Sequence, residues 1–245
     1  MPASVTPTRP FTLCNPGVGS SLLGIVGVGG HAREVAPFIE RVVAMEGVAE
    51  QVISSTDTVV FVDREPHDEM VNGRRVMTEE EFLQSPAAHK LFTIAIASSR
   101  LRQAMDERFV AAGCRPVSIA APTFISYDDV SIGEGALISD HVLLTSNIRI
   151  GRQFQANYFS QVSHDCVIGD YVTLGPRVTC NGNVRIEDHA YIGAGAIIRQ
   201  GTKERPTVIG AHATVGMGAV VVRDVDPGTT VVGNPARPIR RKPDA

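Results

Sequence analysis

VSIGEGALISDHVLLTSNIRIGRQFQANYFSQVSHDCVIGDYVTLGPRVTCNGNVRIEDHAYIGAGAII, the stretch from Val130 to Ile198, repeats every six residues. Counting in sixes from Ile132 finds an aliphatic residue or cysteine at twelve consecutive places. These places are Ile132, Ile138, Leu144, Ile150, Ala156, Val162, Ile168, Leu174, Cys180, Ile186, Ile192 and Ile198. A helical period of 3.6 residues would scatter them around an axis, and simple strand alternation would not select every sixth residue.

A second series, two residues before each place of the first, is apolar at eleven of twelve places, the exception being the small residue Ser160. It comprises Val130, Ala136, Val142, Ile148, Phe154, Ser160, Cys166, Val172, Val178, Val184, Ala190 and Ala196. Two inward side chains followed by a turn describe one short strand and one corner. Three hexads therefore predict a triangular coil, and coils stacked at the strand spacing of ~4.8 Å predict a parallel β-helix.

The corners and one break can also be placed from the sequence. Gly or Asn often follows the first series, as at Gly133, Gly151, Asn157, Gly169, Gly175, Asn181 and Gly193. We expect a positive φ there. The count resumes at Ile209, Val215 and Val221, but eleven residues rather than twelve separate Ile198 from Ile209. This irregularity predicts an extruded loop or an irregular corner over residues 200–207.

Composition limits the class of protein. At 245 residues the chain has room for two modest domains, and its formal charge of -3 gives no bulk attraction to nucleic acid or acidic membranes. The four cysteines show no CxxC pair, and Cys166 and Cys180 occupy inward places, so we expect reduced, buried thiols. We find no signal peptide and no apolar run long enough for membrane insertion. We therefore expect a cytoplasmic protein.

The residues before the repeat predict a tail and a small α/β domain. Residues 1–21, rich in proline and small polar residues, predict an extended tail. Strand patterns cover residues 22–28, 59–62, 91–96 and 116–119, and helical patterns cover 32–45 and 100–112. Their alternation predicts a small parallel, Rossmann-like sheet. We expect this domain over residues 22–121 and the β-helix over 122–245, with a C-terminal cap from residue 225.

Ligands of such a sheet lie at the carboxyl ends of its strands. Gly29 and Gly30 come between a strand and a helix, where the backbone can approach an anion. His31, Asp63, Ser98 and Ser99 also fall at strand ends. Each suits an ordinary turn or cap, but four such residues at one edge favour a binding site.

His164 is the candidate general base. It stands two residues after the inward Val162 and directly before Asp165, which could orient the imidazole if the chain bends there. A polar corner residue without catalytic role is the alternative. Cys166 could act as a nucleophile, but its inward place favours packing. The other repeat histidines share one hexad place that suggests an outward, solvated face: His141, His189 and His212.

Six motifs over about residues 22–240 have a common resemblance. They are Gly27-x-Gly-Gly-His31, Phe61-Val-Asp63, Ile94-Ala-Ile96, His164-Asp-Cys-Val-Ile-Gly-Asp170, Cys180-Asn-Gly-Asn183 and Val232-Gly-Asn-Pro-Ala-Arg237. Together they resemble the sugar O-acyltransferases of the sialic acid O-acetyltransferase type. That group includes N-acetyltransferases for nucleotide-linked 4-amino-4,6-dideoxy sugars, such as those that make diacetylated bacillosamine or N-acetylperosamine.

The resemblance implies a left-handed β-helix, a homotrimer with sites between neighbouring subunits, acetyl-CoA as donor, a nucleotide-linked amino-sugar acceptor, and no metal. His164 matches the general base, Asp165 its supporting acid and Gly182 the glycine whose N–H faces the thioester oxygen. Asn157 and Thr173 match acceptor contacts. The nucleotide-sugar positions are Gly29, Gly30, His31, Asp63, Arg64, Ser98 and Ser99. The acetyl-CoA positions are Gly182, Gly193, Ala194, Gly216 and Arg237.

Three departures from the family pattern leave the sugar and the nucleotide base undetermined. Arg64 stands where relatives have an acid, and Ala97-Ser98-Ser99 stands where many have Gly-Asn. Thr173 stands where the bacillosamine enzymes often have His.

Three other functions stay open. A hydroxyl acceptor, as in sialic acid O-acetylation, would use the same fold and the same base. A γ-carbonic-anhydrase-type metal site would need three histidines, but His141, His164 and His189 are spaced by 23 and 25 residues, neither a multiple of the eighteen-residue coil. A non-catalytic nucleotide-sugar-binding scaffold would leave the His164-Asp165 pair unexplained.

Overall fold

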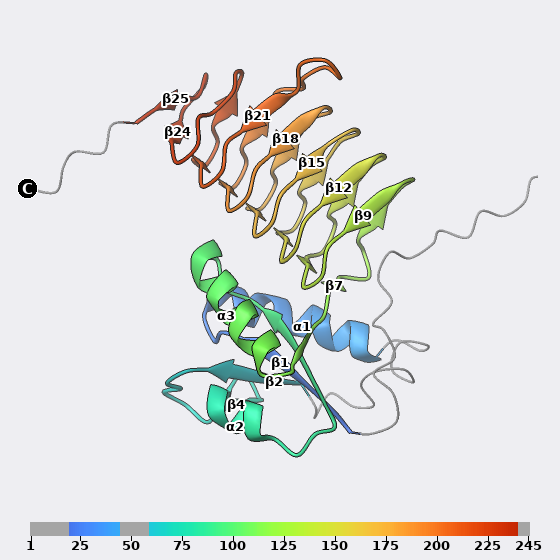
Figure 1. Cartoon of the computed structure of the whole chain (residues 1–245), viewed down its shortest axis with the longest axis vertical. Coiled ribbons are helices and arrows are strands. Elements are labelled where there is room, and N and C mark those ends of the chain that lie inside the picture. The colour runs from blue at the N-terminus through green and yellow to red at the C-terminus, as the bar shows by residue number, and fades with distance from the viewer. Residues whose placement is uncertain (1–19, 45–58, 240–245) are drawn as a thin grey trace, which may run out of the picture.

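The computed structural model describes residues 20–44 and 59–239. An N-terminal α/β domain lies against one end of a stack of triangular coils, with α1 and α3 facing the first coils (Figure 1). None of the helices in these two ranges has the length and apolar character needed to cross a membrane. Residues 1–19 of the predicted tail and Met45 of the first predicted helix lie outside the described residues.

The N-terminal sheet has six strands in the order β3-β4-β2-β1-β5-β6. They are β1 (Ser21–Val26), β2 (Val59–Asp63), β3 (Met70–Val71), β4 (Arg74–Thr78), β5 (His89–Ile94) and β6 (Arg115–Pro116). All pairs are parallel except β3 with β4. The predicted parallel sheet is confirmed. The β3–β4 hairpin was missed because the charged residues Arg74 and Arg75 interrupt its apolar pattern.

Helices cover both faces of this sheet. On one face, α1 (Gly30–Ala44) packs Val35 and Ile39 against the β1 residue Leu23. On the other face lie α2 (Glu79–Gln84) and α3 (Ser99–Ala111), whose Phe82 and Phe109 rings have centroids 5.8 Å apart. The helices predicted from residues 32 and 100 are confirmed. The short helix α2 was not predicted.

Three sheets form the sides of a left-handed parallel β-helix, as predicted. Sheet 1 contains β7 (Ile119–Ala120), β10 (Leu137–Ile138), β13 (Gln155–Ala156), β16 (Thr173–Leu174), β19 (Tyr191–Ile192), β22 (Thr214–Val215), β24 (Thr230–Val232) and the antiparallel β25 (Arg237–Pro238). Sheet 2 contains β8 (Ile125–Ser126), β11 (Leu143–Leu144), β14 (Gln161–Val162), β17 (Thr179–Cys180), β20 (Ile197–Ile198) and β23 (Val220–Val221). Sheet 3 contains β9 (Val130–Ile132), β12 (Ile148–Ile150), β15 (Val167–Ile168), β18 (Val184–Ile186) and β21 (Thr207–Ile209).

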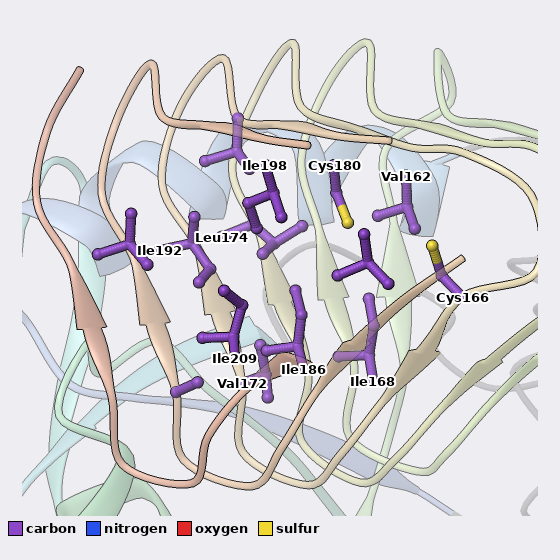
Figure 2. Packing of buried hydrophobic residues seen from close by; sticks show 14 of the residues in the cluster. Val162, Cys166, Ile168, Val172, Leu174, Cys180, Ile186, Ile192, Ile198 and Ile209 are labelled. Atoms are coloured by element: carbon purple, nitrogen blue, oxygen red, sulfur yellow. The ribbon is translucent and has the colours of Figure 1, made fainter. Parts of the chain in front are cut away.

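The two inward series meet along the axis of the coils. Leu137 pairs with Gln155 and Gln155 with Thr173, so before the break each strand pairs with the strand eighteen residues further on. Across the break the offset is 209 − 186 = 23 residues, as for Ile186 and Ile209. The inward side chains form one continuous apolar cluster, seen at close range in Figure 2. Its cysteines, Cys166 and Cys180, are free thiols, as is the buried Cys114 of the N-terminal domain. Cys14 lies outside the described residues.

The corners correct one prediction. Positive φ falls two residues after the predicted places, along three edges of the prism. Edge 1 comprises Gly135, Gln153, Tyr171, His189 and His212; edge 2 comprises His141, Phe159, Arg177, Gly195 and Gly218; edge 3 comprises Asp129, Asn147, Asp165 and Asn183. The glycines at the predicted places instead allow the backbones of neighbouring coils to lie close together. A Cβ on Gly133 would lie 2.6 Å from the carbonyl carbon of Gly151.

The strands on either side of the break still pair with each other. β20 ends at Ile198, β21 begins at Thr207, and Ile186 pairs with Ile209, which confirms the loop between them. The strand predicted over 116–119 is instead divided between β6 of the N-terminal sheet and β7 of sheet 1. β7 therefore precedes residue 122, where we expected the β-helix to begin, and the domain limits stay a prediction.

We expect Gly133→Ala to lower the free energy of unfolding by about 1–3 kcal/mol, because its Cβ would meet the backbone of the next coil. Gly195→Asn is the matched control. A Cβ there meets open space, and its φ of 68° is one that asparagine tolerates. The control should change the free energy of unfolding by less than about 0.5 kcal/mol in urea denaturation followed by circular dichroism. Equal losses in the two variants would contradict the close-approach explanation.

Candidate active site

His164 and Asp165 form a hydrogen-bonded pair beside edge 3. The His164 Nδ1 lies 2.7 Å from the Asp165 Oδ2, and the Asn147 Nδ2 donates to the Asp165 Oδ1 at 3.2 Å. Asp165 has a φ of 59°, and this left-handed corner turns its side chain back toward that of its neighbour. The chain therefore bends where the pair requires it. Both side chains remain about half exposed, at 56% and 47%.

The environment of Asp165 fixes which imidazole nitrogen is free. The hydrogen bond to His164, and then that from Asn147, lower the pKa of the Asp165 carboxyl, which keeps it ionised near neutral pH. A carboxylate can only accept, so the proton of neutral His164 lies on Nδ1. The Nε2 then presents its lone pair and can take a proton from a bound molecule.

Gly182 lies directly against the imidazole. A Cβ on Gly182 would be 2.5 Å from the His164 Cε1 and 2.6 Å from the Nε2, so any side chain there would displace the ring. Among the hydrogen bonds of residues 20–44 and 59–239, none has the Gly182 N–H as donor. The structure therefore brings together the candidate base, its carboxylate and a free backbone N–H. Their catalytic roles stay predictions.

A hollow of about 440 Å³ opens beside this pair. It is lined by Asp165, Val167, Asn183, Val184, Arg185, Thr202, Lys203 and Pro206. The loop between β20 and β21 thus contributes to the surroundings of the pair, a role that the sequence did not indicate. The charge of Lys203 adds to the hydrogen bonds that lower the pKa of Asp165.

A second hollow, of about 580 Å³, lies between the start of α3 and sheet 1. It brings Ser98 and Ser99, predicted to bind the nucleotide sugar, together with Thr173, predicted to contact the acceptor. The other lining residues are Ala97, Arg100, His189, Ala190, Tyr191, His212 and Thr214. The two domains therefore share one candidate binding surface.

His189 is not on an open, solvated face, which corrects the prediction for this residue. Its ring stacks between those of Tyr171 and His212, with centroid distances of 5.1 and 4.6 Å. Burial, and then the neighbouring His212, lower the pKa of His189. The shared hexad place predicted only an outward face, and neither the ring stack along edge 1 nor the position of α3 beside it followed from the sequence.

The remaining nucleotide-sugar residues lie at strand ends, as expected. Gly30 and His31 begin α1, and Gly29 precedes them. Burial, and then the charge of Arg102, lower the pKa of His31 to about 4, so its imidazole is neutral near neutral pH. Asp63 ends β2 and Arg64 follows it, exposed. The Ser98 Oγ also caps α3 by accepting from the Leu101 N–H at 3.4 Å.

The residues matched to acetyl-CoA binding fall into two groups on one chain. Gly193, Ala194 and Gly216 follow strands of sheet 1 beside edge 2, with Arg237 in β25, whereas Gly182 lies beside edge 3. A single chain does not bring these groups together. Asn157, the other predicted acceptor contact, uses its Nδ2 to bond the Leu174 carbonyl at 3.0 Å, which supports the coil.

The described part of the chain holds no group of three or more His, Cys, Asp or Glu side chains placed to bind a metal ion. The three histidines weighed for such a site lie at different edges. His141 is on edge 2, His189 is on edge 1, and His164 is next to edge 3.

Comparisons with known proteins agree with this architecture. Residues 165–200 match the bacterial transferase hexapeptide family (six repeats). The chain is 47% identical over 223 residues to the GDP-perosamine N-acetyltransferase of Escherichia coli O157:H7, covering 91% of this chain and 98% of that protein.

Two solved structures superpose over nearly the whole chain. WeeI from Acinetobacter baumannii AYE is 43% identical, with a TM-score of 0.85 over 90% of this chain and all of WeeI (100%). PerB from Caulobacter crescentus, solved with CoA and GDP-perosamine, is 27% identical, with a TM-score of 0.77 over 91% of this chain and all of PerB (100%). The chain therefore belongs to the family of hexapeptide-repeat sugar acyltransferases of the sialic acid O-acetyltransferase type, which includes GDP-perosamine N-acetyltransferase.

Proposed function

We propose that this protein transfers the acetyl group of acetyl-CoA to the amine of a nucleotide-linked 4-amino-4,6-dideoxy sugar. The observation that carries the proposal is the contact of His164 with both Asp165 and the Gly182 backbone. The relationship to GDP-perosamine N-acetyltransferase, over almost its full length, supports both the donor and the class of acceptor. A GDP-linked sugar is the first acceptor to test.

The reaction needs no covalent enzyme intermediate. The sugar amine attacks the thioester carbonyl, and the His164 Nε2 accepts the proton that the amine loses. The C–S bond then breaks, and CoA leaves as a thiolate that takes this proton back from the imidazolium. Asp165, bonded to the Nδ1, stabilises the imidazolium that forms. The free N–H of Gly182 stabilises the negative charge that develops on the thioester oxygen. Because the thioester is already activated, holding both substrates in position supplies much of the acceleration.

The active form, in this proposal, is a homotrimer. On one chain the His164–Asp165 pair lies beside edge 3, whereas the hollow that contains Ser98 and Thr173 opens on sheet 1 near edge 1. Sheet 3 lies between these two edges. A sugar bound in the hollow therefore needs a base from a neighbouring copy, and a closed ring of three copies provides one for each site.

Sheet 2 is the surface suited to this contact. Its outward row is uncharged and consists of Ile125, Leu143, Gln161, Thr179, Ile197 and Val220. Ile125 and Ile197 are 52% and 42% exposed. By contrast, sheet 3 presents Arg149 and Arg185 outward. Sheet 2 runs between edges 2 and 3, so its packing would bring Gly182 of one copy toward Gly193 of the next.

We place the protein in the cytoplasm. The buried free thiols of Cys114, Cys166 and Cys180 suit a reducing compartment.

The acceptor is tested by incubating the purified protein with acetyl-CoA and a panel of acceptors. We expect acetylation of GDP-, UDP- or dTDP-linked 4-amino sugars and little acetylation of free or CMP-linked sialic acid. A neutral amine is a better nucleophile than a hydroxyl and requires less assistance from the base. Mass spectrometry of the products identifies the acetylated atom. If the protein transfers acetyl groups only to sialic acid hydroxyls, it is an O-acetyltransferase and the proposed N-acetyltransferase activity is wrong.

We expect His164→Ala to lower kcat by about 10² or more, because the amine loses its proton acceptor. Asp165→Asn should lower kcat by about 10- to 100-fold, since an amide holds the imidazole less firmly and cannot stabilise its charge. Steady-state kinetics and calorimetry with CoA separate catalysis from binding, and CoA affinity should change little. A folded His164→Ala variant with the parent kcat would exclude His164 as the base.

Ile197→Glu should convert the trimer into monomers and abolish most of the activity, because it places a charge within the uncharged row of sheet 2. Ser131→Glu is the matched control, since Ser131 is an exposed outward residue of β9 in sheet 3. Light scattering after size-exclusion chromatography gives the mass of each variant. A monomeric parent protein with full activity would contradict the trimer.

A further inference from the structure

Edge 2 carries a row of stacked side chains at the level of the His164–Asp165 pair. The Phe159 ring stacks on the His141 ring, with centroids 4.9 Å apart and planes inclined by 17°. On the same ring, the Arg177 Cζ lies 5.6 Å from the Phe159 centroid. The three residues occupy the same corner of three consecutive coils. The row therefore runs along edge 2 past the coil that contains His164.

The conformation at this corner is unfavourable for an aromatic residue. Phe159 has a φ of 61°, and glycine fills the same corner without strain further along the edge, at Gly195 and Gly218. A bulky side chain rarely adopts this conformation, because its Cβ crowds the backbone. Burial within its own chain does little to offset the strain, since Phe159 remains 54% exposed. A strained and exposed aromatic residue indicates a contact or a functional role.

In the proposed homotrimer this row meets the His164–Asp165 pair of the neighbouring copy. Sheet 2 lies between edges 2 and 3, so packing through sheet 2 brings edge 2 of one copy beside edge 3 of the next. Symmetry about an axis along the stack places equal levels opposite each other. Phe159 and Asp165 are at successive corners of one coil. Phe159 of one copy therefore faces the pair of the next.

The two edges also complement each other in charge and exposure. Arg177 takes part in none of the ion pairs among the described residues, and it lies one coil beyond Phe159. Edge 3 presents the Asp165 carboxylate, which is 47% exposed, beside a His164 ring that is 56% exposed. The uncharged outward row of sheet 2 connects the two edges. A second copy of this chain is the partner that suits edge 2.

We propose that Phe159 of the neighbouring copy forms an apolar wall of the active site, which shields the His164–Asp165 pair and the acetyl-CoA thioester from water. The inference rests on the proposed function and its homotrimer. A base open to solvent can also activate water. Water would then attack the thioester carbonyl, the C–S bond would break, and acetate and the CoA thiol would leave without acetylated sugar.

Phe159→Gly removes the ring and suits the left-handed corner, so this variant should fold and assemble. We expect kcat for acetyl transfer to fall about tenfold, and the fraction of acetyl-CoA lost as free acetate to rise by a similar factor. Phe159→Tyr, which keeps the ring, should retain the parent values. Thiol titration measures released CoA, and mass spectrometry measures acetylated sugar. Parent values of both quantities in Phe159→Gly would overturn the proposal.

Tyr127→Ala is the matched control. Tyr127 is an aromatic residue of similar exposure, at 58%, and it lies beside edge 3 two coils before the His164–Asp165 pair. This variant should keep the parent ratio of transfer to hydrolysis. An equal loss in Tyr127→Ala would show that Phe159 acts only through the general stability of the assembly, and it would overturn the proposal.

Mixed trimers test whether the ring acts across the interface. His164→Ala supplies the ring without the base, and Phe159→Gly supplies the base without the ring. When the two are co-expressed with different affinity tags and purified through both, each mixed trimer has one site where an intact base faces an intact ring. We expect about one third of the parent activity, well above that of either variant alone. Activity no higher than the Phe159→Gly copies provide would overturn the proposal.

The parent protein separates this inference from the proposed function. A parent that acetylates an amino-sugar nucleotide as a trimer, with no recovery in the mixed trimers, would refute only the role of Phe159. A parent that transfers no acetyl group would refute the proposed function as well. A parent that is fully active as a monomer would refute the homotrimer together with the wall.

Discussion

The close stacking of the coils is the constraint on which the rest of this protein depends. A single coil has only other coils to bury its inward side chains against, so the core exists only as a stack. The spacing of adjacent strands sets the distance between coils, and the glycines at the corners allow the backbones to approach that closely. At Gly133 even a methyl group would meet the carbonyl of Gly151. Before the break after Ile198, the stack repeats every eighteen residues along each edge.

The geometry of the His164–Asp165 pair follows from this stacking. Edge 3 needs a left-handed residue at each level, and Asp165 occupies one of those places with a φ of 59°. Such a conformation costs on the order of 1 kcal/mol, which asparagine and aspartate tolerate better than most residues. The same corner turns Asp165 toward His164, and Asn147 from the coil before it holds the carboxylate. The geometry that builds the edge therefore also orients the base.

The contact between the two domains has an apolar part, where Ile119 and Leu137 of sheet 1 join the core cluster of the N-terminal domain, and a polar part that centres on α3. Asp106 bonds Arg152, Gln153 and Tyr171, and Arg102 bonds the carbonyls beside them. Buried networks of this kind fix relative positions because a shift breaks hydrogen bonds that water cannot replace. The strand ends that are proposed to hold the nucleotide are thereby placed at a fixed distance from Thr173 on the β-helix.

The sequence alone determined the β-helix, because a six-residue period can be satisfied by no other regular structure, and it singled out His164 beside Asp165. The strand ends with Asp63 and Ser98 followed from the alternation of strands and helices. Only the tertiary structure decided which other residues surround these sites. Arg102 looks like any arginine on a surface helix until α3 is placed against edge 1, and His189 looks solvated until the same helix lies beside it. These contacts join residues about 50 to 70 positions apart in the chain, and no local pattern encodes such distances.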